Sequence, residues 1–177
     1  MNDIKSGVII RHDVDRRAFN SLKKAQLEKS FNIKTTYYFR IKKCSFKTDI
    51  INRISKLGHE IGYHYEELST FRNDHKKALS EFKNNLGKFR SISDVKTVVM
   101  HGKPTSKSDN RNLLSNTDIK KFNLYGDAYL SIDYSNVYYF SDTGRSWSNK
   151  TRTNYRDYVS SLPVENVFST DDLINFI

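Results

Sequence analysis

Short apolar runs rich in β-branched residues alternate along this chain with longer stretches whose apolar residues follow helical spacing. Strands are expected over 7–12, 33–41, 59–65, 95–100, 128–132 and 137–140. Helices are expected over 17–31, 50–57, 74–89 and 169–177, with a weaker one over 154–162. Such alternation is typical of parallel βα units, so the pattern predicts an α/β fold built as a sheet or a barrel.

The length and the cysteine count narrow the class of protein. A chain of 177 residues suits one domain, and no linker divides it, so we expect a single domain over 1–177. The one cysteine, Cys44, excludes a disulfide framework and a cysteine-based zinc cluster. No apolar run approaches the ~18 residues of a membrane span, and the first residues lack a signal-peptide pattern. These features predict a soluble, cytoplasmic protein.

The net charge of +10 raises the alternative of a nucleic-acid partner. The basic residues are scattered as pairs such as Arg16-Arg17 and Lys76-Lys77, and none belongs to a longer basic run. No recognition-helix, zinc-knuckle or RNP-like motif accompanies them. We therefore expect no nucleic-acid partner, and interpret the charge as a solvated surface that can also attract anionic precursors.

Polar residues with catalytic chemistry cluster where the expected strands end. Asp13 and Asp15 follow the first strand at a spacing that places both carboxylates on one side. Such a pair suits one carboxylate that holds a metal and another that accepts a proton; the alternative is a surface turn neutralised by arginines. His64 ends the third strand and His101 the fourth. In parallel α/β folds these ends converge on one site.

The segment GHEIGYHYEE contains two histidines, five residues apart. This spacing and Gly62 exclude the helical H-E-x-x-H motif of zinc proteases. On a strand, His59 and His64 face opposite sides. We expect His64 to be the ligand candidate and His59 to be structural.

A further group of polar residues follows the later strands. Asp142, Arg145 and Trp147 lie around a glycine turn, where they suit a sugar or an anionic group. The alternative is an ordinary polar loop with one anchoring tryptophan. Together with Arg40, these residues are our candidates for binding the substrate.

The segments RHDVDR, TYYFR, GHEIGYHYEEL and HGKP, in this order, resemble the polysaccharide deacetylase family, the NodB-homology domain of carbohydrate esterase family 4. The similarity covers nearly the whole chain and is greatest to the divergent bacterial branch associated with surface-polysaccharide gene clusters. The resemblance implies a distorted (β/α) barrel and a hydrolase that removes acetyl groups from sugars with a divalent metal bound by one Asp and two His. The chain ends before the family's final strand and histidine motif, so the barrel is expected to be incomplete.

Carried over by position, the resemblance implies that Asp13 is the general base, Asp15 a metal ligand and His64 the first metal histidine. The family's second metal histidine corresponds here to Leu68, which cannot bind metal. His101 is the substitute that we expect for the third ligand, and Glu66 or Glu67 is the alternative. An Asp-His-His set suits zinc.

Two functions follow from the resemblance. The first is a metal-dependent deacetylase-like hydrolase acting on a sugar of a surface-polysaccharide precursor. The second is a catalytically impaired relative that binds carbohydrate or serves a structural role. An incomplete barrel would expose a strand edge, which favours a homodimer.

Overall fold

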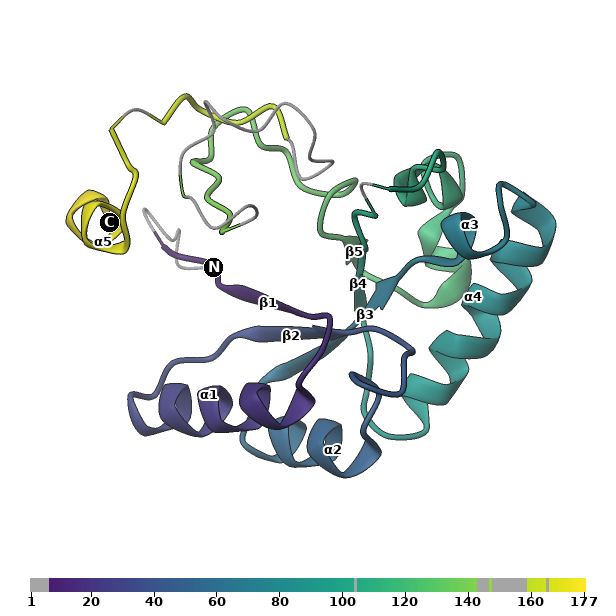
Figure 1. Ribbon diagram of the computed structural model, residues 1–177, viewed down its shortest axis with the longest axis horizontal. Helices are drawn as coiled ribbons and strands as arrows, with labels where there is room; N and C mark the ends of the chain where they lie inside the picture. The colour runs from purple at the N-terminus through teal and green to yellow at the C-terminus, as the bar shows by residue number, and fades with distance from the viewer. Residues whose placement is uncertain (1–6, 104, 143–146, 148–158, 165) are drawn as a thin grey trace.

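The computed structural model describes residues 7–103, 105–142, 147, 159–164 and 166–177. The described residues form a five-stranded, wholly parallel sheet in the order β1-β2-β3-β4-β5 (Figure 1). The strands are β1 (Arg11–Val14), β2 (Thr36–Phe39), β3 (Glu60–Tyr65), β4 (Thr97–Met100) and β5 (Gly126–Asp127). Because neighbours in the sheet are also consecutive in the chain, every connection moves in the same direction, and the carboxyl ends of all strands meet at one edge.

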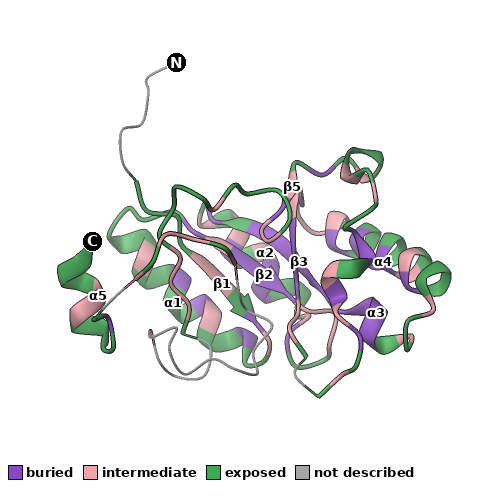
Figure 2. Ribbon diagram, turned by 90° about the horizontal axis from the view of Figure 1, so that it is seen from above, coloured by how far each residue is buried: buried purple, intermediate pink, exposed green. Residues whose placement is uncertain are grey.

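Helices connect the strands. They are α1 (Ala18–Ser30), α2 (Thr48–Lys56), α3 (Glu67–Thr70), α4 (His75–Arg90) and α5 (Thr170–Phe176), with short 3₁₀ helices η1 (Asn110–Leu113) and η2 (Ile119–Phe122). Figure 1 shows α1 and α2 beneath β1 and β2, α4 beside the far end of the sheet, and α5 well apart from α4. The burial pattern in Figure 2 places most buried residues on the strands and on the helix faces turned toward them.

The two faces of the sheet differ in character because side chains alternate along each strand. The face toward the helices carries the aromatic core, including Tyr37, Phe39 and Tyr63, all fully buried. On the opposite face the Tyr38 ring lies across Gly62, where a Cβ atom would stand 2.2 Å from ring carbons. Glycine is therefore required at this position, which lies two residues before His64 on the same face of β3.

The predicted α/β class with parallel strands is confirmed, while the distorted barrel stays a prediction. The chain beyond β5 returns to β1. The Arg11 guanidinium donates to the hydroxyls of Tyr129 and Tyr139, each at 2.9 Å, and lies 4.6 Å from the centre of the Tyr129 ring. These contacts tie the first strand of the sheet to the segment that follows the last.

Several predicted elements differ from the structure. The first strand begins at Arg11 rather than at residue 7, and Ile9, which was expected in that strand, is 91% exposed. The predicted strand over 128–132 is wrong. The Asp127 carboxylate accepts from the backbone N–H groups of Tyr129 and Leu130, at 2.7 and 3.1 Å, and so turns the chain out of the sheet.

Near the C-terminus, only one of the predicted elements is confirmed. Over 137–140 the structure has a single bridge, Tyr138 to Leu162, in place of a strand. The predicted helix over 154–162 lies partly outside the described residues, and the described positions 159–162 are not helical. The final helix is confirmed as α5, which begins at a capping box made by Ser169 and Asp172.

Among the described residues, no helix is long and apolar enough to cross a membrane. Cys44 is exposed and unpaired.

Candidate metal centre

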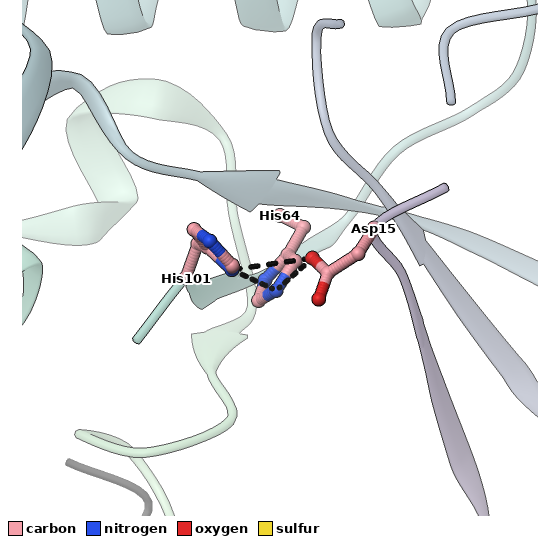
Figure 3. Close-up of side chains that lie close together, drawn as sticks. All are labelled: Asp15, His64 and His101. Atoms are coloured by element: carbon pink, nitrogen blue, oxygen red, sulfur yellow. Dashed lines mark hydrogen bonds and ion pairs between the residues drawn. The ribbon is translucent and has the colours of Figure 1, made fainter. Parts of the chain in front are cut away.

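Three predicted ligands, separated widely in sequence, meet at the carboxyl edge of the sheet. Asp15 follows β1, His64 lies in β3 and His101 follows β4; their ligand atoms all lie within 4.8 Å of one another (Figure 3). Asp15 Oδ1 is 3.6 Å from His64 Nε2 and 3.2 Å from His101 Nδ1, and the two nitrogens are 3.2 Å apart. The structure therefore brings together the set predicted from the strand ends.

His64 is held with one nitrogen committed to the backbone. Its Nδ1 lies 3.1 Å from the carbonyl oxygen of Val99, so this nitrogen carries the proton and donates, and Nε2 presents a lone pair to the cluster. Burial lowers the pKa of His64 below 6.5, and the neighbouring His101 acts in the same direction, although Asp13 and Asp15 oppose the shift. His64 is therefore neutral at pH 7, as a metal ligand must be.

Asp15 supplies an oxygen that lacks a hydrogen-bond partner. Oδ1 is buried, and none of its contacts with described residues has the geometry of a hydrogen bond. Burial by itself would raise the pKa of Asp15, but His101, His64 and Arg40 together hold it below 3.8. The group is thus an ionised carboxylate. Its buried Oδ1 lies within ion-pair distance of His101, His64 and Arg40 but has no hydrogen-bond partner among the described residues, and a bound cation would satisfy it.

The spacing of the three atoms fits a tetrahedral zinc. Ligand atoms about 2.0–2.1 Å from a tetrahedral zinc lie about 3.3–3.4 Å from each other. The three observed separations, 3.2, 3.2 and 3.6 Å, bracket this value. The Asp15 side chain as a whole is 48% exposed, whereas that of His64 is 3% exposed and the Asp15 Oδ1 atom itself is buried.

Neighbouring residues fix the position of His101. Its backbone N–H donates to the Tyr65 carbonyl at 2.7 Å, which extends the pairing of β4 with β3 by one residue. Its own carbonyl accepts from the Asn110 side chain at 2.7 Å, and the Asn110 amide oxygen accepts from the backbone N–H of Ser69 at 2.9 Å. Asn110 was not predicted, since nothing in its local sequence distinguishes it from other loop asparagines.

Arg40 lies beside the cluster and is paired with a buried acid. Its guanidinium makes three hydrogen bonds of 2.8–3.0 Å to the Glu66 carboxylate, which is only 4% exposed. Its Nη1 lies 3.6 Å from Asp15 Oδ1. Arg40 is thus anchored to a buried partner and faces the ligand carboxylate; its predicted contact with substrate stays a prediction.

No protein family model matches this chain, and no curated protein matches it significantly. The chemistry of the cluster is therefore inferred from the geometry of this chain.

Asp13, the predicted general base, lies on the same side of β1 as the cluster. Its carboxylate is 3.9 Å from the Arg11 guanidinium, and its side chain is 32% exposed. Its negative charge is the first of the influences that raise the pKa of His64 against burial. The structure thus places an accessible carboxylate within electrostatic reach of the ligand histidine.

The remaining candidates lie elsewhere. Leu68 is buried in the hydrophobic core. Glu67, an alternative ligand, is buried and accepts from Tyr63 and Asn85, and burial raises its pKa. His59 is structural, as predicted: it is buried beside Thr35 and the Ala25 carbonyl.

The structure describes only part of the later loop, so its predicted substrate residues stay a prediction. The Trp147 indole donates to the Thr170 hydroxyl at the start of α5. Asp142 is exposed, and within the described part of the chain neither residue forms a hydrogen bond or ion pair with the three ligands. Arg145 lies outside the described residues.

Proposed function

We propose that this protein is a zinc-dependent hydrolase that removes an acetyl group from a sugar of a surface-polysaccharide precursor. The observation that carries the proposal is the convergence of Asp15, His64 and His101 at spacings that suit zinc, around an ionised carboxylate oxygen that lacks a hydrogen-bond partner among the described residues. The sequence resemblance to the polysaccharide deacetylases supplies the reaction class. A distorted barrel, of which the described sheet would form the larger part, belongs to the same proposal.

Bound zinc supplies a Lewis acid that polarises a carbonyl and lowers the pKa of a water molecule. The residues of the chain supply the rest. Asp13, accessible and next to the cluster, accepts the proton of the attacking water in this proposal. His64 is fixed in one tautomer by the Val99 carbonyl, so that it offers a lone pair without reorganising.

The first test is metal binding. Dialysis of the purified protein against zinc, followed by mass spectrometric metal analysis, is expected to give one zinc per chain in the wild type and a near-complete loss in His101→Ala. His75→Ala is the matched control, because His75 is exposed on α4 and lies outside the cluster. Equal zinc content in all three proteins would remove His101 from the ligand set.

The second test is catalysis. Zinc-loaded protein is expected to release acetate from N-acetylated amino sugars, and Asp13→Asn is expected to lower kcat by about 10²–10⁴-fold while the zinc content stays unchanged. Acetate release at the wild-type rate by Asp13→Asn would exclude Asp13 as the base.

The second candidate function, a catalytically impaired relative that binds carbohydrate, has one observation in its favour. Leu68 stands where the family has its second metal histidine, and the structure places it in the core, 3% exposed. Stoichiometric zinc together with sugar binding, but without acetate release from any acetylated sugar offered, would favour this candidate.

A further inference from the structure

Basic residues gather in the loops that carry or adjoin the candidate metal ligands. They lie in the loops that follow β1, β2 and β4, at the edge of the sheet where the three ligands meet. We call this set the cationic rim: Arg16, Arg17, Lys42, Lys43 and Lys103. Arg16 directly follows the ligand Asp15, and Lys103 stands two residues beyond the ligand His101. All members are exposed except Lys42, which is partly buried.

The loop after β2 lies directly against the ligand loop after β1. The Cys44 thiol is 3.6 Å from the Asp15 carbonyl oxygen, and the Ser45 hydroxyl donates to the Val14 carbonyl. Lys43 precedes these contacts by one residue. The Lys42 ammonium is 3.3 Å from Glu66 Oε1, the same oxygen that accepts from Arg40. The lysines of this loop therefore stand beside Asp15 in space.

The acids of this region do not neutralise the rim. The Asp15 carboxylate faces the two histidines and Arg40, while Glu66 is shared by Arg40 and Lys42. Glu67 is buried beneath the site with Tyr63 and Asn85. In the described part of the chain, Arg16, Arg17, Lys43 and Lys103 form no ion pair.

Some lysines elsewhere in the described part of the chain are paired with acids. On and beside α4, Lys77, Lys88 and Lys96 each lie within 3.7 Å of a carboxylate oxygen. The unpaired cations at the metal centre thus create a local positive potential, which concentrates and orients anionic ligands.

We propose that the sugar taken by this site carries a phosphate or diphosphate group, which the cationic rim binds while the acetylated part of the sugar reaches the metal centre. This inference rests on the proposed function and narrows its substrate to an anionic class. Cations from three separate loops suit a group with several charged oxygens better than a single carboxylate, because each oxygen meets its own partner. A neutral polysaccharide chain would leave these charges without a counterpart.

Equilibrium binding tests the inference separately from catalysis. N-acetylglucosamine 1-phosphate and neutral N-acetylglucosamine are titrated by calorimetry into zinc-loaded Asp13→Asn protein, in which the proposed acetate release is suppressed, at low salt and at about 0.5 M salt. The phosphorylated sugar is expected to bind more tightly, with an advantage that shrinks at high salt. The double variant Arg16→Gln/Lys43→Gln is expected to weaken its binding about tenfold, roughly threefold per exposed charge, and to leave the neutral sugar unaffected.

The matched control is Lys120→Gln/Lys121→Gln, which removes the same charge from η2, just before the amino end of β5 and therefore away from the metal edge. Equal affinities for the two sugars, or the same loss in both double variants, would overturn the inference. Tighter binding of a single-stranded RNA oligonucleotide, lost in the rim variant alone, would also overturn it in favour of a nucleic-acid partner.

Parallel acetate assays keep the two proposals apart. Selective binding of the phosphorylated sugar without acetate release from any substrate supports the rim and contradicts the proposed function. Efficient deacetylation of neutral oligosaccharides, unchanged in the rim variant, supports the function and overturns the rim. The binding of a sugar nucleotide and of a short prenyl diphosphate sugar is also measured, because both carry a diphosphate but come from different sources. The ligand that binds more tightly identifies the source. Equally weak binding of both ligands overturns the inference.

Discussion

Arg40 and Glu66 share three hydrogen bonds of 2.8–3.0 Å immediately beside Asp15. Both side chains are largely buried. Loss of either one would therefore leave the charge of the other buried without an ionic partner. The pair therefore holds a guanidinium at a fixed distance from the carboxylate that would bind zinc. Outer-shell partners of this kind tune the affinity of a site without touching the metal.

Removing this anchor is expected to weaken zinc binding. In Glu66→Gln the Arg40 guanidinium loses its ionic partner and can close on Asp15, where it competes with the metal for Oδ1. We expect zinc affinity to fall about 10–100-fold, measured by competition with a chromogenic chelator. Glu81→Gln, on the exposed side of α4, is the control and should bind zinc as the wild type does. An unchanged affinity in Glu66→Gln would assign the pair a purely structural role.

Asn110 provides a second positioning test. It links the His101 carbonyl to the Ser69 backbone and is 1% exposed. Asn110→Ala leaves buried backbone groups without partners, so we expect a loss of about 1–3 kcal/mol in the free energy of unfolding together with weaker zinc binding. Urea unfolding of the zinc-free protein measures the first effect. If stability fell while the zinc affinity stayed constant, His101 would not depend on Asn110 for its position.

Gly62 and Gly87 form a matched pair for testing the packing of the sheet. A methyl group at Gly62 would stand 2.2 Å from the Tyr38 ring and 3.2 Å from the Thr97 carbonyl oxygen, whereas at Gly87, inside α4, it would meet nothing within 4 Å. Gly62→Ala is expected to destabilise the fold by about 1–3 kcal/mol. Gly87→Ala is expected to stabilise it by about 0.5–1 kcal/mol. Denaturant unfolding checks both, and a stabilising Gly62→Ala would contradict the placement of Tyr38.

The stability of the zinc-free protein is expected to fall on mild acidification. Burial, and secondarily the charge of Lys24, lowers the pKa of His12 below 6.5 despite its 2.6 Å contact with Glu28. The unfolded chain therefore takes up a proton at His12 before the folded protein does. The contribution of neutral His12 is complete above pH 6.5 and is lost as the pH falls from there toward the lower folded pKa.

Thermal unfolding between pH 7.5 and 5.5 tests whether stability falls as the pH falls. The melting temperature of the wild type should decrease with falling pH, and His12→Gln should show a shallower decrease. Some slope will remain in the variant, because burial lowers the pKa of His64 as well. Parallel profiles for the two proteins would show that His12 does not contribute.

The sequence predicted the central part of the fold because its strands there are fully buried and its helices amphipathic. The stretch containing Tyr37 and Phe39 and the apolar spacing of α2 left little room for another assignment. The region after β4 is different, because its 3₁₀ turns and the short β5 depend on particular side-chain contacts. The Asp127 carboxylate ends β5 by capping a turn, and no periodicity reveals such a contact.

The candidate site, like the fold, could be predicted only in part. The proximity of Asp15, His64 and His101 could be predicted because each stands at a strand end and parallel strands bring those ends together, whereas the choice of these three as metal ligands followed from the resemblance. Arg40 was expected to bind substrate, and the sequence did not reveal its pairing with Glu66, which lies in another loop. The contact of the Trp147 indole with α5 was not expected either. Both are long-range contacts, which no local pattern predicts.

The three ligands are contributed by the first, third and fourth strands in order of synthesis. A nascent chain that has emerged only as far as β3 carries Asp15 and His64 but lacks His101, and two ligands hold zinc far less firmly than three. If the proposed centre binds zinc, metal acquisition would therefore be a late event in the biogenesis of this protein. Occupancy of the proposed centre would then require a sheet assembled as far as β4.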